Sequence, residues 1–249
     1  MSRLFTFGCS FTKYHWPTWA DILGKEFHEH QNWAEPGAGN QFILNSLVEC
    51  DLRNKISNLD TVGIMWTNVA REDRYTDYWV LPGNIYTQDT YDEKFVRNMI
   101  TTKGLYIRDL AFMYSVDKIL KDIGCRYFYL SMVDITNPLN HGDTDVRGEL
   151  QELFDLYTPV LKQIKPSIHN LVFNYDWSSR PAMMENGLRH DYHPLPLEHI
   201  EYMEKVIPEY KISNATLTWA KQIDSLYRTK FIKEDLWGKE SLSVYSCLL

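Results

Sequence analysis

Apolar residues along this chain follow two patterns, short unbroken runs and stripes with the spacing of a helix. The run Thr61–Trp66 (TVGIMW) lacks the alternation of a half-exposed strand, which is expected for a strand that is buried on both faces. Short apolar-rich runs at Arg3–Phe7 (RLFTF) and Arg126–Met132 (RYFYLSM) predict two more strands. Two further strands are predicted at Gln31–Ala34 and at Leu171–Tyr175.

Between these runs, apolar residues recur at intervals of three and four, which predicts amphipathic helices. Gly124 follows one such stripe directly, at a position where glycine favours the end of a helix. Another stripe stops before Pro166, which cannot continue a helix. The predicted helices span about Trp16–Phe27, Asn40–Ile56, Met113–Ile123, Leu150–Ile164, Leu197–Ile207 and Asn214–Tyr227.

This alternation of strands and helices predicts an α/β protein with a mostly parallel sheet and helices on both faces. The segment Thr67–Gly104 departs from the pattern, because it is long, polar and rich in tyrosine and tryptophan. It has too few aliphatic residues for a core of its own, so we interpret it as an excursion from one domain. A C-terminal tail at about 230–249 shows no decisive pattern.

The composition excludes several classes of protein. Aromatic residues make up 14% of the 249 residues, whereas disordered chains contain few. The net charge of −7 argues against nucleic acid as the main partner, because phosphate binding needs a basic surface. No apolar run approaches the roughly 20 residues of a membrane span, and the N-terminus does not resemble a secretion signal. The four scattered cysteines are typical of free thiols in a reducing compartment, so we expect a cytoplasmic protein.

Polar residues with catalytic chemistry follow the predicted strands, where parallel sheets usually bind their ligands. Ser10 lies in a Gly8-Cys9-Ser10 turn after the first strand, and Gly37 lies in a glycine-rich loop after the second. Asn68 follows the third strand, and Asp191 and His193 lie in a turn-forming segment before a late helix. Together they supply a nucleophile, amide donors, a base and an acid, which are the groups needed for acyl transfer through a covalent serine intermediate.

Other functions of single residues stay open at this point. Cys9 adjoins Ser10 and is an alternative nucleophile, although adjacent side chains in a turn point in different directions. His190 and His193 have the spacing HxxH, which is an alternative metal site without a further cluster of ligands. His199, in the predicted helix that follows, is expected to be exposed. Aromatic and arginine side chains of the excursion are candidates for a substrate wall, and these are Arg71, Arg74, Tyr75, Tyr78, Trp79 and Tyr86.

These residues resemble the four sequence blocks of the SGNH (GDSL-like) hydrolase superfamily. The blocks are Gly8-Cys9-Ser10, Asn32 followed by Gly37, Asn68, and Asp191 with His193, and they run in the family's order within about residues 3–207. The resemblance implies a flavodoxin-like, three-layer α/β/α sandwich around a parallel sheet of about five strands. It also implies one SGNH hydrolase-like domain over residues 1–249.

Carried over by position, the resemblance makes Ser10 the nucleophile, His193 the general base and Asp191 the acid that orients its ring. The backbone N–H groups of Ser10 and Gly37 and the side chain of Asn68 would form the oxyanion hole, and no metal or cofactor is implied. The sequence departs from the family in three places. It has GCS where GDS is usual, one residue rather than two between Asp191 and His193, and no glycine or aspartate around Asn68.

We therefore expect a serine-dependent ester hydrolase. A small-molecule or carbohydrate ester, and in particular an O-acetylated carbohydrate, is the expected substrate. An acyltransferase that uses the same site and a non-catalytic binding module that keeps the fold are the alternatives.

Overall fold

Four parallel strands form the central sheet of the protein, in the order β2-β1-β3-β6. The structure is a computed structural model, and it describes residues 2–86, 90–137, 147–172 and 193–231. The strands are β1 (Arg3–Phe7), β2 (Glu29–Asn32), β3 (Thr61–Trp66) and β6 (Arg126–Ser131). Because β1 and β3 occupy the middle of the sheet, their carboxyl ends open onto the same central edge.

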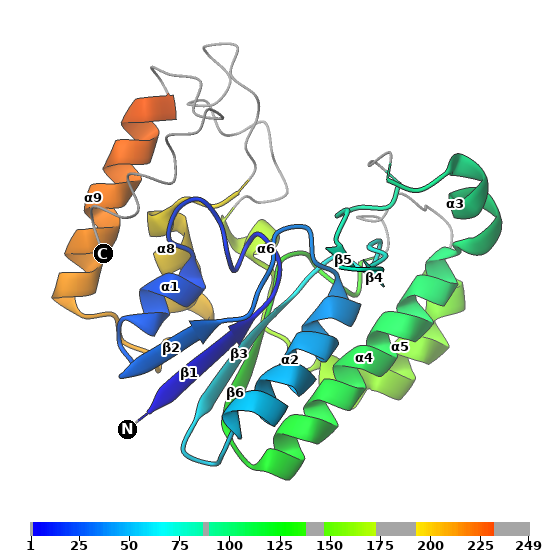
Figure 1. Cartoon of the computed structure of the whole chain (residues 1–249), viewed down its shortest axis with the longest axis horizontal. Helices are drawn as coiled ribbons and strands as arrows, with labels where there is room; N and C mark the ends of the chain where they lie inside the picture. The colour runs from blue at the N-terminus through cyan, green and yellow to red at the C-terminus, as the bar shows by residue number, and fades with distance from the viewer. Residues whose placement is uncertain (1, 87–89, 138–146, 173–192, 232–249) are drawn as a thin grey trace.

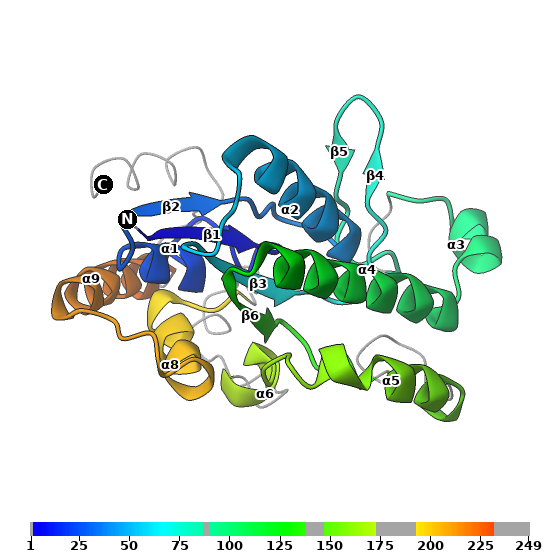
Figure 2. The same ribbon diagram turned by 90° about the horizontal axis from the view of Figure 1, so that it is seen from below.

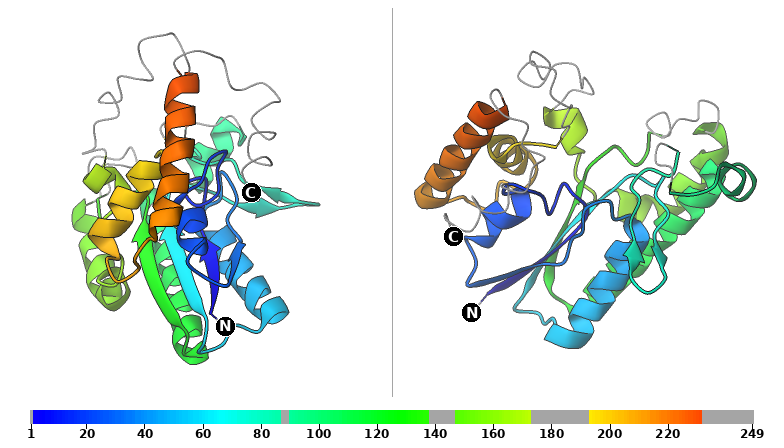
Figure 3. Two further views of the ribbon diagram at one scale, coloured as in Figure 1. Left: turned by 90° about the vertical axis from the view of Figure 1, so that its left-hand side faces the viewer. Right: turned by 45° about the horizontal axis from the view of Figure 1, so that its top comes forward.

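Helices cover both faces of this sheet (Figure 1). The helices α2 (Asn40–Asn54), α4 (Thr102–Ile123) and α5 (Arg147–Leu161) pack on one face. The helices α1 (Trp19–Gly24), α6 (Ile168–Val172), α8 (Pro196–Val206) and α9 (Asn214–Phe231) pack on the other. Figure 3 shows the same arrangement from two further directions. The predicted fold class, an α/β protein with helices on both sides of a parallel sheet, is confirmed.

Side chains along each strand divide between the two cores as the pleat requires. Phe5 and Phe7 of β1 point into the core under α2, α4 and α5, whereas Leu4 points into the core under α1 and α8. All six residues of β3 are buried, as the unbroken run TVGIMW predicts. The sheet therefore has no solvent-exposed face at β3.

The prediction of a strand at Leu171–Tyr175 is wrong for its first two residues, which lie in α6. Its remaining residues lie outside the described part of the chain. Pro166 and Ser167 explain the difference, because the Ser167 hydroxyl accepts a hydrogen bond from the Asn170 N–H at 3.2 Å and caps a short helical turn. The chain instead touches the outer edge of β6 earlier, through a single parallel bridge from Ile164 to Tyr129. Among the described residues the sheet thus has four strands, not about five.

The first helix is shorter than its apolar stripe. Thr18 is its N-cap and forms a capping box with Asp21, so the helix begins at Trp19 and ends at Gly24. Trp16 lies before the helix and is held separately, because its Nε1 donates to the Pro194 carbonyl at 2.7 Å.

The excursion between β3 and α4 contains a small hairpin, β4 (Arg74–Tyr75) and β5 (Trp79–Val80), and the helix α3 (Glu93–Met99). In Figure 2 the hairpin projects beside α2, at the sheet's carboxyl edge. Tyr75 and Tyr78 in this hairpin are largely exposed. Within the described residues, no helix is both long and apolar enough to cross a membrane.

Gly63, in the middle of β3, leaves room for the rings of Trp19 from α1 and Phe128 from β6. A Cβ atom on this residue would lie 2.6 Å from Phe128 Cζ and 3.0 Å from Trp19 Cη2. Both rings are part of the core and have little room to move.

We therefore predict that Gly63→Ala lowers the free energy of unfolding by about 1–3 kcal/mol, through overpacking of these two rings. Gly148→Ala in α5 is the matched control, since a Cβ there meets no atom within 4 Å. That change should leave stability unchanged or raise it by up to about 1 kcal/mol. Urea unfolding measures both, and a Gly63→Ala protein as stable as the wild type would show that the contact is not tight.

Candidate functional site

Ser10 lies in a tight turn directly after β1. The Cys9 carbonyl accepts hydrogen bonds from the N–H groups of Thr12 and Lys13, at 2.8 and 3.0 Å, and these bonds close the turn around Ser10. Gly8 permits the turn, because a Cβ there would lie 2.1 Å from Thr12 Oγ1. Ser10 is 8% exposed, so the turn holds it largely buried at the end of β1.

Cys9 points into the core. It is fully buried, and its Sγ lies 3.8 Å from Met132 Sδ at the end of β6. A nucleophile has to meet its substrate at the surface of a pocket, so this orientation favours Ser10 over Cys9.

His193 lies beside the Ser10 turn. Its ring stacks on the ring of Tyr14, with centroids 3.8 Å apart and planes inclined by 17°. The ring of Phe11, the residue after Ser10, has its centroid 5.1 Å from that of His193. In the described residues no hydrogen bond links Ser10 Oγ to His193. Asp191 and His190 lie outside the described part of the chain.

Gly37 lies in the loop after β2, with a φ of 81° that favours glycine. A Cβ on Gly37 would lie 2.2 Å from the Leu81 carbonyl oxygen, so any other residue would push the excursion away. The Gly83 N–H also donates to the Gly37 carbonyl at 3.2 Å. Asn32 ties the start of this loop to the serine turn, because its Nδ2 donates to the Thr12 carbonyl at 2.8 Å.

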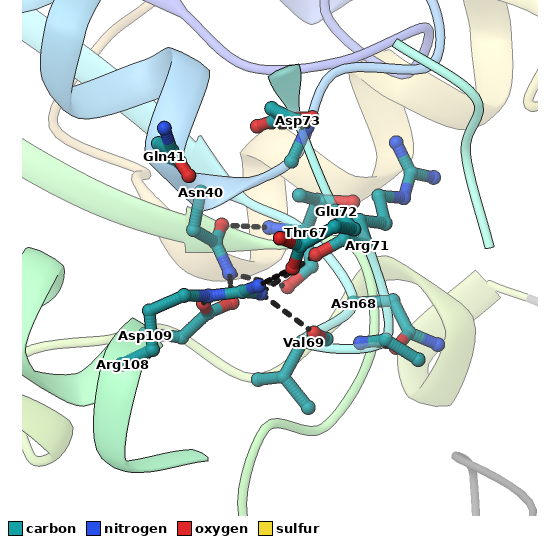
Figure 4. Close-up of polar contacts among 12 residues, drawn as sticks. Asn40, Gln41, Thr67, Asn68, Val69, Arg71, Glu72, Asp73, Arg108 and Asp109 are labelled. Carbon is teal, nitrogen blue, oxygen red and sulfur yellow. Dashed lines mark hydrogen bonds and ion pairs between the residues drawn. The ribbon is translucent and has the colours of Figure 1, made fainter. Parts of the chain in front are cut away.

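Asn68 follows β3 and forms a turn with its own side chain. Its Oδ1 accepts a hydrogen bond from the Ala70 N–H at 2.7 Å, which fixes the side chain and leaves the Nδ2 group as the possible donor to a ligand. Asn68 is 8% exposed. In Figure 4 it points away from the Arg108–Asp109 pair.

A buried amide joins the end of β3 to the start of α2. The Asn40 side chain accepts a hydrogen bond from the Thr67 N–H at 3.0 Å and donates to the Thr67 carbonyl at 3.2 Å. Its Nδ2 also donates to Asp109 Oδ2 at 2.6 Å (Figure 4). Asn40, Thr67 and Asp109 are fully buried, so these bonds form in a low-dielectric interior where they are strong.

Arg108 holds the chain that follows Asn68. Its Nη2 donates to the carbonyls of Val69 and Arg71, at 3.2 and 2.6 Å (Figure 4). The same guanidinium forms ion pairs with Glu72 and Asp109. Because the guanidinium contacts backbone and two carboxylates together, it fixes the loop after β3 on α4.

Asp73, also in this loop, caps α2 from outside the helix. Its carboxylate accepts hydrogen bonds from the N–H groups of Gly39 and Phe42, both at 2.8 Å. These are donors at a helix N-terminus that the helix itself cannot satisfy. Burial raises the pKa of Asp73, while these hydrogen bonds oppose the rise.

Two histidines differ from what the sequence suggests. His199 lies in α8 and is 1% exposed, so the expectation that it is exposed is wrong. His169, for which the sequence makes no prediction, is buried in α6 with its ring centroid 5.5 Å from that of Phe11. Its backbone N–H donates to the Met132 carbonyl at the end of β6. The Ser167 cap after Pro166 is the one sequence signal that could have located this helix.

Burial raises the pKa of Asp109 to about 6, although Arg108 and Asn40 act in the opposite direction. The folded state therefore holds this proton more tightly than the unfolded chain, whose carboxyl titrates near 3.8. It follows that ionisation of Asp109 lowers stability as the pH rises from about 4 to about 6, and that the cost is constant above that window.

We predict that the free energy of unfolding of the wild type, relative to Asp109→Asn, falls by roughly 2–3 kcal/mol between pH 4 and pH 6. Urea unfolding at a series of pH values measures it. Asp122→Asn, an exposed position of the same helix, reports the effect of simply removing a charge from α4. A difference between wild type and Asp109→Asn that stays constant over this range would contradict the buried titration.

No protein-family model matches the chain, and no curated protein matches its sequence. Solved structures do resemble its fold. A GDSL-like lipase from Bacteroides thetaiotaomicron is 15% identical, with 87% of this chain and 88% of that chain covered and a TM-score of 0.46. The psychrotrophic esterase EstA from Pseudoalteromonas sp. is 12% identical, with 84% and 97% covered and a TM-score of 0.45.

A member of the lipolytic G-D-S-L family from Veillonella parvula is also 12% identical, with 82% and 97% covered and a TM-score of 0.45. The first and third of these proteins are described as GDSL-like, which is the family that the sequence blocks resemble. Because the identities and TM-scores are low, the case for a function rests on the residues of this chain.

Proposed function

We propose that the protein is a serine-dependent ester hydrolase of the SGNH type. The observation that carries the proposal is the convergence of Ser10, Gly37, Asn68 and His193 at the carboxyl edge of the sheet. Ser10 and Asn68 follow the two central strands, and the His193 ring packs on Tyr14 and Phe11 of the serine turn. These residues come from four separate parts of the chain, and each brings a group that acyl transfer needs.

In the proposed reaction, Ser10 Oγ attacks the ester carbonyl carbon while His193 takes the hydroxyl proton. The carbonyl oxygen becomes an oxyanion, which accepts hydrogen bonds from the Ser10 N–H, the Gly37 N–H and Asn68 Nδ2. Such pre-aimed donors each contribute on the order of 10²–10³ in rate. The positive φ of Gly37 and the side-chain turn of Asn68 fix these donors before substrate arrives.

Collapse of this intermediate expels the alcohol, which receives the proton from His193, and leaves an acyl group on Ser10. Water then attacks the acyl-enzyme with His193 as base, and the carboxylic acid is released. Asp191 is the proposed partner that holds the His193 ring in the productive tautomer. The scheme uses no metal or cofactor.

An O-acetylated carbohydrate is the proposed substrate. The β4–β5 hairpin beside the Gly37 loop exposes Tyr75 and Tyr78, and aromatic faces of this kind stack on sugar rings. Gly37 contacts Leu81 just beyond the hairpin, so a substrate on Ser10 that extends past Gly37 would meet this wall. A sugar hydroxyl in place of the water that attacks the acyl-enzyme would make the same site an acyltransferase.

We predict that Ser10→Ala and His193→Ala each lower kcat/KM toward 4-nitrophenyl acetate by at least about 10³-fold, because each removes half of the nucleophile–base pair. Release of 4-nitrophenol measures the rate. His28→Ala is the matched control, since His28 is an exposed histidine at the opposite end of the sheet, next to the start of β2.

Hydrolysis that survives in Ser10→Ala would refute the nucleophile, and hydrolysis that survives in His193→Ala would refute the base. A folded wild type with no activity toward acetyl, longer acyl or O-acetylated sugar esters would instead favour the non-catalytic binding module. Faster product formation when a sugar acceptor is added would favour the acyltransferase.

A further inference from the structure

Arg71 lies at the candidate site without a carboxylate partner. Five other arginines in the described residues form ion pairs, and these are Arg3, Arg53, Arg74, Arg97 and Arg108. Arg71 forms none, although it is only partly exposed. A partly buried cation without a counter-ion is costly, which makes its surroundings worth close inspection.

The backbone of Arg71 is held from two sides. Its carbonyl accepts the hydrogen bond from Arg108, and the residue forms an isolated antiparallel bridge with Asn84. The side chain therefore starts from a fixed point at the base of the excursion. A preorganised arginine loses less conformational entropy when it binds an anion.

The Arg71 guanidinium forms one short hydrogen bond and one long contact to sulfur. Nη1 donates to the Ala38 carbonyl at 2.6 Å, directly after Gly37. Nη2 is 3.7 Å from Met132 Sδ, which is a weak acceptor, and the buried Nε has no hydrogen-bond partner. Nε and Nη2 lie on the same side of a guanidinium, and this side matches the two oxygens of a carboxylate.

Met132 connects this edge to the catalytic residues. Its sulfur lies 3.8 Å from Cys9 Sγ and 3.8 Å from Thr67 Oγ1, and Cys9 and Thr67 precede Ser10 and Asn68. Met132 thus covers the Nε–Nη2 edge of Arg71 and also contacts the residues that precede the proposed nucleophile and oxyanion donor. Methionine is flexible, so it can move aside when a ligand enters.

Asp73 is the carboxylate that also feels the Arg71 charge, which lowers the pKa of Asp73 against the larger effect of burial. Its oxygens are occupied by the N–H groups of Gly39 and Phe42 at the start of α2. Asp73 is therefore committed to its helix and does not pair with the Nε–Nη2 edge of Arg71, which Met132 covers.

We propose that Arg71 binds a carboxylate on the substrate, and that the substrate is an acetyl ester of an acidic sugar or a similar hydroxy acid. This inference rests on the proposed function. Because an acetyl group carries no carboxylate, the charge belongs to the alcohol part of the ester. Arg71 then acts as a specificity residue that orients this part while Ser10 attacks the acetyl carbonyl.

The test compares two acetyl esters that differ in charge, 4-acetoxybenzoate and methyl 4-acetoxybenzoate. The measured quantity is the ratio of their kcat/KM values, and comparison between variants cancels the intrinsic reactivity of each ester. We expect Arg71→Gln to lower the ratio about 10- to 100-fold, which corresponds to the loss of a charge-assisted hydrogen-bonded pair. Arg71→Lys keeps the charge without the planar fork and should give an intermediate ratio.

Arg97→Gln is the matched control, since Arg97 belongs to the same excursion but pairs with Glu93 on the surface of α3. It should leave the ratio unchanged. If Arg71 only supports the Ala38 loop, Arg71→Gln will slow both esters equally and the ratio will not move, which would overturn the proposal.

Binding gives a second result that does not depend on turnover. In ligand-observed NMR, glucuronate should bind the wild type while glucose should not, and the glucuronate signal should be lost in Arg71→Gln. Glucuronate binding without hydrolysis of either ester would support the anion site and refute the hydrolase. Hydrolysis of both esters with a kcat/KM ratio that Arg71→Gln leaves unchanged, without glucuronate binding, would support the hydrolase and refute the anion site.

Discussion

The side-chain amide of Asn40 pairs with both backbone polar groups of Thr67, and the carboxyl edge of the sheet depends on this contact. Thr67 follows the last residue of β3, where pairing with β1 has ended, so a side chain takes the place of a neighbouring strand. Asn40 is also the first residue of α2. The contact thus sets the loop that carries Gly37 and the loop that carries Asn68 at a fixed separation. Ser10 lies in the turn after β1, the strand between β2 and β3.

Buried charge completes this arrangement. Arg108 donates hydrogen bonds to the carbonyls of the loop after Asn68 and pairs with Asp109. The Asp109 carboxylate in turn accepts a hydrogen bond from the Asn40 amide. Buried ion pairs add little to net stability, but loss of one partner leaves a charge that nothing compensates. The loop after Asn68 therefore has one position in which these hydrogen bonds and ion pairs all form. This rigidity suits a site whose proposed donors must be aimed before the substrate arrives.

The sequence alone predicts the central architecture well. The strands Arg3–Phe7 and Thr61–Trp66 match the structure at both ends, because unbroken apolar runs leave few alternatives to a buried strand. Helix ends are less well predicted, since a cap such as Thr18 with Asp21 decides where α1 begins regardless of the apolar stripe. The strand expected at Leu171 fails for a similar reason, because the local bond of Ser167 outweighs the apolar pattern.

The residues of the candidate site also differ in how well the sequence alone predicts them. Ser10, Gly37 and Asn68 are recognisable in sequence because each follows a strand, and the structure brings them to one edge with His193. Asn40, Arg108 and Asp109 are not recognisable, because apart from the adjacent Arg108–Asp109 pair their partners are 27 to 69 residues away in the chain, without a local pattern. The surroundings of the Arg71 guanidinium likewise depend on Met132, which lies 61 residues further along.

The central claim is that Ser10 is an activated nucleophile, and covalent labelling with a fluorophosphonate tests it most directly. The reagent reacts with serine hydroxyls that a base activates, and peptide mass spectrometry identifies the labelled residue. The account predicts a single adduct on Ser10 that is absent from Ser10→Ala and strongly reduced in His193→Ala. Labelling that persists in Ser10→Ala, or no adduct on the folded wild type, would contradict it.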